Sequence, residues 1–329
     1  MIFPIAHSIV PIVFRGNKGD KVNRFLFRLV IVSGVACLAL LDSQVAYAAD
    51  EPLDVKIGLV QGLFRDVQPV MMKAMAKPFR EVMAKQTGCD CDVEICTDAL
   101  CLAQQLKDKK LHLGVFHGFE FAWAQKKCPE LVPLIITIPH SRKVQAYIVV
   151  HTDSELKKLS DLEGEVVMIP RGAKSHSLAF LEKARDGFAK NIATPKTDTK
   201  LTTEDCLNGV VRGEIVAALV DSASLEGYQA LQPGAFKQLK MLRQSEAFPA
   251  AVVAYHKDVL TAQQAQAIRT GMLDAHKNTT GKMLMMMWNL KGFEEAPATY
   301  QNELDAILKS YPVPEKTPLD KQSKITVPK

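Results

Sequence analysis

The chain has little excess of charge of either sign once its first 48 residues are set aside. The whole sequence of 329 residues carries 41 Lys and Arg against 36 Asp and Glu, a net charge of +5. Residues 1–48 hold five of the basic and two of the acidic residues, so the remainder has a net charge of +2. Proteins that hold nucleic acids electrostatically concentrate basic residues on one surface. The composition therefore gives no support for a nucleic-acid partner.

Internal repeats and low-complexity segments are also missing from the sequence. No self-similar period of about 20 to 50 residues is present, which argues against solenoids and propellers. With 47% hydrophobic and 23% charged residues, the chain has the composition of an ordinary globular protein. The 281 residues after position 48 are enough for two domains of ordinary size or one large one.

The most apolar run of the chain is too short to cross a membrane and marks a leader instead. The thirteen residues Leu29–Leu41 are mostly apolar, whereas a helix that spans a bilayer needs about 20. Arg24 and Arg28 precede this run, and the small-residue pattern Ala46-Tyr47-Ala48 follows it. These are the three parts of a secretory signal peptide. We predict a signal peptide over residues 1–48 and a periplasmic location, with an uncleaved anchor as the alternative.

Cysteine spacing excludes the common metal-binding motif, because no C-x2-C pair is present. Six cysteines follow the leader, namely Cys89, Cys91, Cys96, Cys101, Cys128 and Cys206. An even number of cysteines in an exported chain favours disulfides, with fifteen possible connectivities. We predict at least one disulfide, no metal site and no cofactor.

A catalytic thiol needs a histidine partner, and no nucleophile with both a base and an orienting group is visible, so no enzyme is predicted.

Strands and helices are expected to alternate along the chain in two series. The expected strands of the first series are 55–60, 92–96 and 111–116, and those of the second are 146–150, 166–169 and 216–220. Apolar residues with helical spacing lie between them. A further strand at 250–255 precedes a helical C-terminal part. This order predicts α/β units with parallel strands and crossover helices.

Four motifs resemble the phosphate/phosphonate-binding family of periplasmic solute-binding proteins. They are Ile57–Gly62, Asp98 with the strand and turn at 111–118, Leu159–Val167 with the following Ser175-His176-Ser177, and Gly213–Asp221. The third is similar to the family's sLaDLkGkrV and the fourth to its G-x-V-D-A-A-x-x-D. The resemblance covers roughly residues 53–312.

Three positions depart from the family pattern. Ala99 stands where the family has a tyrosine, Leu178 where it has a glycine, and Thr203 where it has a ligand-contacting histidine. These changes leave the expected fold intact and concern the identity of the ligand.

The resemblance implies a two-lobed type II periplasmic-binding-protein fold, α/β, with mixed, mainly parallel sheets and two hinge crossings. Lobe one is expected to comprise residues 49–142 and 247–312, and lobe two residues 143–246. Residues 313–329 are expected to form a flexible tail.

The implied function is capture of a small oxyanion, phosphate or phosphonate, by hinge closure and its delivery to an ABC permease. We expect a monomer; a ligand-sensing module for a membrane sensor and a cysteine-dependent enzyme are the alternatives.

The first group of candidate ligand contacts is Ser175, His176 and Ser177, where a loop turns into a helix. Free N–H groups and the helix dipole bind oxyanions at such a start, and hydroxyl groups add donors. The alternative is that one serine only caps the helix.

The second group of candidates lies at strand ends. His117 and Gly118 follow a strand at its carboxyl end, where open α/β sheets place ligands; a turn is the alternative. Asp221 ends a strand of the other series and can either contact a ligand or cap the next helix. Gly62 is a candidate because it belongs to the turn after the opening strand.

Overall fold

The computed structural model describes residues 54–64, 71, 72, 74, 76–139 and 144–314. The predicted signal peptide and residues 315–329 of the predicted tail lie outside this part of the chain. Among the helices of the described residues, none combines the length and the apolar character needed to cross a membrane.

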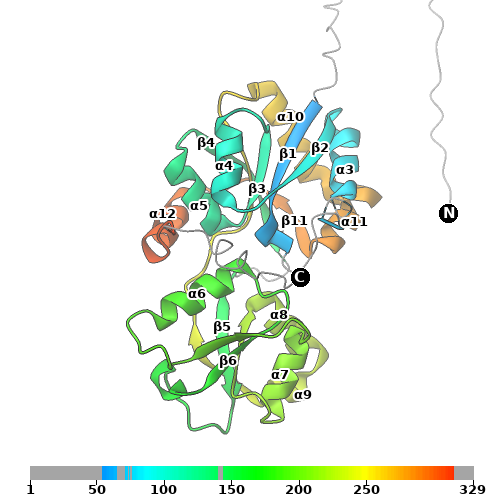
Figure 1. Ribbon diagram of the computed structural model, residues 1–329. Helices are drawn as coiled ribbons and strands as arrows, with labels where there is room; N and C mark the ends of the chain where they lie inside the picture. The colour runs from blue at the N-terminus through cyan, green and yellow to red at the C-terminus, as the bar shows by residue number, and fades with distance from the viewer. Residues whose placement is uncertain (1–53, 65–70, 73, 75, 140–143, 315–329) are drawn as a thin grey trace, which may run out of the picture. The chain divides into compact units, whose positions relative to one another are not determined.

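The first sheet has six strands in the order β11-β4-β10-β3-β1-β2 (Figure 1). The strands are β1 (Asp54–Val60), β2 (Asp90–Cys96), β3 (Leu113–Phe116), β4 (Leu131–Pro139), β10 (Val252–His256) and β11 (Leu290–Glu294). β1 pairs in parallel with β2 and β3, whereas β10 runs antiparallel between β3 and β4. β11 is antiparallel to β4. The sheet is therefore built from two segments that are far apart in the sequence.

Two groups of helices pack on the first sheet. One group is α3 (Lys77–Thr87), α10 (Ala262–Leu273) and α11 (Thr279–Met287); the other is α4 (Ala99–Lys107), α5 (Gly118–Lys127) and α12 (Tyr300–Ser310). Alternate residues of β1, Val55, Ile57 and Leu59, are fully buried in the core that α3 and α10 close. This follows from the two-residue period of a strand, which turns every second side chain to the same face.

The second sheet has five strands in the order β7-β6-β8-β5-β9. They are β5 (Ala146–His151), β6 (Val166–Ile169), β7 (Thr194–Thr197), β8 (Ala217–Asp221) and β9 (Leu239–Gln244). β6 is parallel to β7 and β8, and β5 is antiparallel to β8 and β9. Both sheets are thus mixed, and the α/β fold class predicted from the sequence is confirmed.

Helices cover both faces of the second sheet. On one side lies α6 (Ser175–Arg185), and on the other α7 (Thr203–Val211) and α8 (Ser222–Leu231), followed by the short α9 (Pro233–Phe236). Ile148 and Val150 of β5 belong to the core beneath α6, whereas Tyr147 and Val149 belong to the core beneath α7 and α8. The remaining short elements are the 3-10 turns η1 (Gln61–Phe64), η2 (Leu159–Leu162) and η3 (Asp274–Lys277).

Local sequence signals explain where several helices begin and end. Asp98 caps α4 by accepting hydrogen bonds from the backbone N–H groups of Leu100 and Cys101 at 2.9 and 2.8 Å. Gly88 ends α3 with φ = 70°, a left-handed conformation that glycine adopts without strain. Pro78 lies in the first turn of α3, where proline is tolerated.

None of the six cysteines that follow the predicted leader forms a disulfide in the structure. Five of them are buried and Cys101 is partly exposed. The predicted disulfide is therefore unconfirmed.

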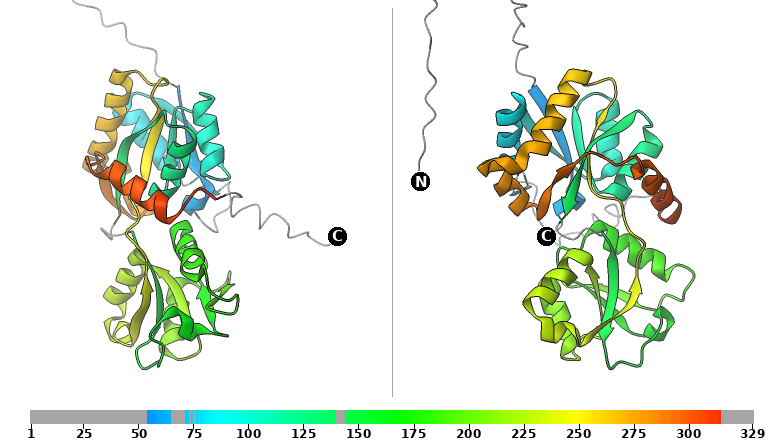
Figure 2. Two further views of the ribbon diagram at one scale, coloured as in Figure 1. Left: turned by 90° about the vertical axis from the view of Figure 1, so that its left-hand side faces the viewer. Right: turned by 180° about the vertical axis from the view of Figure 1, so that it is seen from behind.

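Two chain crossings join the two sheets. The first leads from β4 to β5, and its residues 140–143 lie outside the described part. The second leads from β9 to β10 and runs as an extended segment (yellow in Figure 2). The two crossings are hydrogen-bonded to each other beside the second sheet: the N–H of Phe248 donates to the Val144 carbonyl oxygen at 2.8 Å, and the N–H of Ala146, the first residue of β5, donates to Ser245 Oγ at 2.9 Å.

Candidate ligand-binding site

A cavity of about 320 Å³ lies at the carboxyl end of β8, where three helices begin. Its lining includes Lys174 and Ser177 at the start of α6, Thr203 at the start of α7, and Asp221 and Ser224 at the start of α8. A helix start offers N–H groups without an intrahelical partner and the positive end of the helix dipole. Side chains of Thr202 and Asp221 cap α7 and α8, whereas α6 has no side-chain cap, so the start of α6 is the one that suits an oxyanion. We refer to this space as the anion cavity.

Ser177 lines the anion cavity and has a buried hydroxyl without a hydrogen-bond partner among the described residues. The residue is 1% exposed. A buried polar group without a partner costs about 1–3 kcal/mol, so its presence needs an explanation. The N-cap of α6 is Lys174, whose side chain makes no capping hydrogen bond. Neither predicted serine therefore occupies the cap position, the role that the alternative assigned to one of them.

Asp221 has the capping role that the sequence offered as its alternative. Its Oδ1 accepts a hydrogen bond from the backbone N–H of Ser224 at 2.7 Å, which caps α8. The residue also lines the anion cavity. Asn289, between α11 and β11, lines the same cavity from the other sheet's part of the chain and has φ = 52°. The sequence analysis missed Asn289, and an asparagine after a Met-rich helix gives no signal for such a place.

A second cavity, of about 430 Å³, contains Gly62 and Ser175 in its lining, together with Asp98 and Glu120. A Cβ atom at Gly62 would stand 2.7 Å from Ser175 Oγ and 3.5 Å from Glu120 Oε1. A larger residue at position 62 would therefore displace the Ser175 hydroxyl from its present place. Ser175 and Ser177 are one residue apart but line different cavities, which separates the two hydroxyls that the sequence analysis grouped together.

The two predicted histidines contact each other but line neither cavity. Their ring centroids are 6.4 Å apart, and His117 Nε2 lies 3.2 Å from the Gly62 carbonyl oxygen, to which it donates. Burial lowers the pKa of His117 to about 3 and that of His176 to about 4. Both rings are therefore neutral near pH 7 and add no positive charge to the site.

Gly118 is required by packing. A Cβ atom there would stand 2.3 Å from the carbonyl oxygen of Pro249 and 2.5 Å from that of Ala250. The start of α5 thus lies directly against the second crossing. Like the histidines, Gly118 lines neither cavity.

Glu120 is a functional candidate that the sequence analysis missed. The side chain is 7% exposed, and its Oε2 has no hydrogen-bond partner among the described residues. Burial raises the pKa of this carboxyl to about 8, so it holds a proton near pH 7. The only signal in the sequence is an acidic residue between Phe119 and Phe121, in a stretch whose aromatic residues indicate burial.

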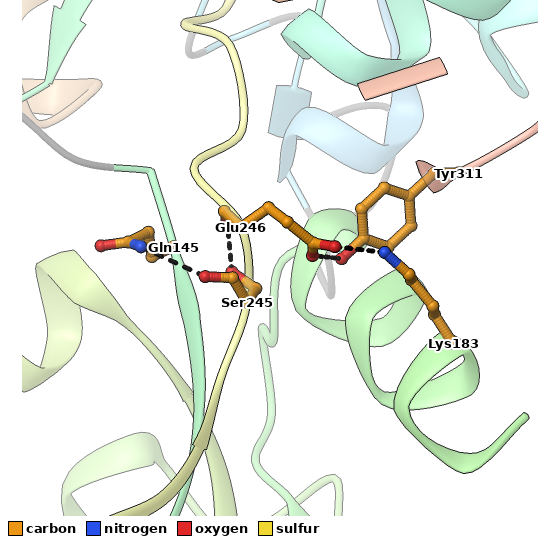
Figure 3. Close-up of polar contacts among 5 residues, drawn as sticks. All are labelled: Gln145, Lys183, Ser245, Glu246 and Tyr311. Carbon is orange, nitrogen blue, oxygen red and sulfur yellow. Dashed lines mark hydrogen bonds and ion pairs between the residues drawn. The ribbon is translucent and has the colours of Figure 1, made fainter. Parts of the chain in front are cut away.

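A polar cluster joins α6, the second crossing and the chain after α12 (Figure 3). Lys183 forms an ion pair with Glu246, and the Tyr311 hydroxyl donates to Glu246 Oε2 at 2.7 Å. Lys183 Nζ also lies 4.6 Å from the centre of the Tyr311 ring. Partial burial opposes the charge of Glu246, but the bonds from Lys183 and Tyr311 outweigh it and hold its pKa at about 2. We call Lys183, Glu246 and Tyr311 the crossing cluster.

Known proteins share this fold. PhnD1 from Prochlorococcus marinus (MIT 9301), solved in complex with methylphosphonate, is 15% identical over 80% of this chain and 100% of its own, with a TM-score of 0.56. A binding protein component of an ABC phosphonate transporter from Pseudomonas aeruginosa (PA3383) is 13% identical over 84% and 94%, with a TM-score of 0.54. XAC2383 from Xanthomonas citri, solved bound to ATP, is 14% identical over 78% and 97%, with a TM-score of 0.58. At such identities the likeness shows the type II periplasmic-binding-protein fold alone.

The family model decides the assignment. No curated protein sequence matches the chain. The model of the ABC transporter phosphonate periplasmic substrate-binding proteins, however, matches residues 62–300, well over half of the chain. That family consists of extracytoplasmic substrate-binding components of transporters, which confirms the resemblance found in the sequence motifs. The protein therefore belongs to the phosphonate-binding family of periplasmic substrate-binding proteins that serve ABC transporters.

Proposed function

We propose that this protein binds the oxyanion group of a phosphonate or phosphate in the anion cavity and delivers the ligand to an ABC permease. The observation that carries the proposal is Ser177 Oγ, which is buried and has no hydrogen-bond partner in the described part of the chain, at the point where three helices begin. An anion in the cavity would accept a hydrogen bond from this hydroxyl. It would also be attracted by the Lys174 ammonium group, which belongs to the same lining.

The chemistry of the lining fits a tetrahedral anion with a further polar group. Donors to a charged oxygen form shorter and stronger hydrogen bonds than donors to a neutral one. Asp221 is acceptor-only when ionised, so it would repel a bare oxyanion and instead accept a hydrogen bond from a protonated oxygen, a hydroxyl or an ammonium group. Ser175 in the second cavity is the other hydroxyl of this helix start, and we propose that it contacts the ligand from that side.

We propose that the lobes are the predicted ones, residues 49–142 with 247–312 and residues 143–246, and that they close on the ligand as a monomer. The strand membership supports this division, because β1 to β4, β10 and β11 form the first sheet and β5 to β9 the second. The two crossings lie at the boundaries of the division, which is where a hinge absorbs backbone rotation.

Two further proposals concern maturation of the chain. We propose that residues 1–48 are removed as a signal peptide, and the mass of the exported protein tests the cleavage after Ala48. We also propose that one disulfide forms in the oxidising compartment. Cys96 and Cys101 are the favoured pair, because the nearby Cys101 thiol adds to the effect of burial in raising the pKa of Cys96. Titration of thiols in denaturant without reductant tests for this disulfide. We expect four titratable thiols, and six would exclude a disulfide.

A thermal-shift screen tests the proposed ligand class. Methylphosphonate, phosphate and sulfonates form one arm, and neutral and basic amino acids form the other. A ligand present at 100 times its dissociation constant stabilises the folded protein by about 2.7 kcal/mol. We expect stabilisation by phosphonates or phosphate and none by amino acids. Stabilisation by amino acids alone would exclude the oxyanion site.

A further inference from the structure

Cys128, Glu130 and His256 bring three metal-binding side chains together outside both cavities. One ligand atom of each residue, namely a thiol sulfur, a carboxylate oxygen and an imidazole nitrogen, lies within 4.8 Å of the other two. No other group of this kind occurs among the residues that the structure describes. Cys128 and His256 are buried, with 2% and 6% of their surface exposed, while Glu130 is partly exposed. The cluster therefore has a mostly dry interior and one side toward solvent.

The cluster lies at the end of the first sheet that is remote from the ligand cavities. Val252, at the start of β10, pairs with Phe116 at the carboxyl end of β3, whereas His256 at the other end pairs with Leu131. Four residues of strand separate the two ends, which corresponds to about 14 Å. A ligand bound here would therefore be separate from a solute in the anion cavity.

The backbone holds the three side chains in place. The N–H of Leu131 donates to the Cys128 carbonyl oxygen at 3.1 Å, and the N–H of Lys257 donates to the Glu130 carbonyl oxygen at 3.1 Å. Cys128 forms the C-cap of α5, and His256 is the last residue of β10. The donors thus sit on a helix end, a short turn and a strand end that are hydrogen-bonded to one another.

We propose that Cys128, Glu130 and His256 form a zinc-binding site. Zinc takes Cys sulfur, His nitrogen and Glu oxygen at about 2.0–2.3 Å in a tetrahedral arrangement, which separates the ligand atoms by about 3.5 Å. The Cys128 Sγ and Glu130 Oε2 atoms are already 3.5 Å apart. Three protein ligands leave the fourth position of a tetrahedron for water or for a group of another molecule. The cysteine spacing predicted no metal site. It could not indicate this one, because Cys128 and His256 are 128 residues apart in the sequence.

Metal binding would replace the present hydrogen bond of the cluster. The Cys128 thiol now donates to Glu130 Oε2; on binding, its S–H bond breaks, the sulfur–zinc bond forms and the proton leaves to solvent. Asp258 Oδ2 lies 3.9 Å from His256 Nδ1. Nδ1 now accepts a hydrogen bond from the backbone N–H of Asp258 at 3.3 Å, so the imidazole hydrogen is on Nε2. If Nε2 bound the metal, this hydrogen would move to Nδ1 and the bond from the Asp258 N–H would be given up. The Asp258 carboxylate could then accept the hydrogen, the usual outer contact of a zinc-bound histidine.

Cobalt(II) binding to the reduced full-length protein tests the site, because cobalt occupies zinc sites and reports a sulfur ligand by a charge-transfer band in the near ultraviolet. We expect one cobalt per chain, the charge-transfer band, and displacement by one equivalent of zinc. Cys128→Ser should abolish the band, and His256→Gln should weaken zinc binding by at least about a hundredfold in competition with a chromogenic chelator. Asp258→Asn should weaken it by about 10- to 100-fold.

Two matched variants control for general effects. His151 and Asp153 repeat the arrangement of His256 and Asp258, with the N–H of Asp153 donating to His151 Nδ1 at 3.2 Å, but they have no cysteine beside them; His151→Gln should retain the band. Cys101→Ser, at a partly exposed thiol, should retain it too. If Cys128→Ser fails to fold, two other observations test the zinc site. They are the charge-transfer band of the wild type and the loss of this band in Glu130→Gln or His256→Gln. Absence of the band in the wild type, or its survival in His256→Gln, would overturn the proposal.

Discussion

Glu120 is the residue that links the stability of this protein most directly to pH. Its pKa is raised by burial to about 8, from an ordinary value of 4.5. Between these pH values the folded protein holds a proton that the unfolded chain has released. The stabilising contribution is therefore complete below about pH 4.5 and is lost as the pH rises toward 8, with a slope of up to about 1.4 kcal/mol per pH unit.

We expect Glu120→Gln to remove this loss of stability between about pH 4.5 and 8. Glutamine keeps the size of the side chain and cannot ionise, so its free energy of unfolding should stay flat where that of the wild type falls. Urea unfolding at pH 5, 6.5 and 8 measures the difference between the two proteins. Glu214→Gln, at an exposed position paired with Arg212, serves as the control. Parallel curves for the wild type and Glu120→Gln would show that Glu120 is ionised throughout.

Single residues also show what sequence reasoning can reach. The start of a helix after β6 was predicted from the loop pattern, and the structure places Ser175 and Ser177 in the first turn of α6. The sequence could not predict that the two serines line different cavities. This arrangement depends on the close approach of Gly62, which belongs to another part of the chain. Glu120 was missed for the same reason, since its pKa follows from tertiary burial and not from its neighbours in sequence.

Among the elements, strands with apolar or alternating patterns were predictable, whereas an exposed strand and one that contains proline were not. The strand expected at 146–150 is β5, all but the last residue of which is buried. β7 gave no signal because its four residues, Thr194–Thr197, are all exposed at the edge of the sheet. β4 contains Pro133 and ends at Pro139, residues that argue against a strand in sequence analysis.

The crossing cluster gives a prediction for the packing of α6 against the chain after α12. Tyr311→Phe removes the hydroxyl that donates to Glu246 and retains the ring that packs at 4.9 Å from Phe248. A hydrogen bond to a charged group contributes about 1.5–3 kcal/mol, and the side chain of Glu246 is 47% exposed. We therefore expect a loss below this range, about 1 kcal/mol, in urea unfolding. Tyr255→Phe is the control, and equal effects of both changes would contradict a role for the bond.

For the whole molecule, the account predicts that the two lobes close around the ligand. Lobes that are joined by two crossings move as bodies when the crossing residues rotate. Small-angle scattering with and without saturating methylphosphonate, or with phosphate if that is the ligand of the screen, should show a smaller radius of gyration in the bound protein. An unchanged radius at saturation would indicate a rigid binding module.

Calorimetric titration of methylphosphonate and phosphate into the wild type, Ser177→Ala and Ser175→Ala tests the central claim most directly. The account predicts one binding site in the wild type and an affinity about 10- to 100-fold weaker in Ser177→Ala, because a charge-assisted hydrogen bond of about 1.5–3 kcal/mol is lost. The ligand-free melting temperature of Ser177→Ala should stay the same or rise, since the variant removes a buried hydroxyl without a partner. Unchanged affinity together with a lower ligand-free melting temperature would contradict the anion cavity, and so would the absence of binding heat for both anions in the wild type.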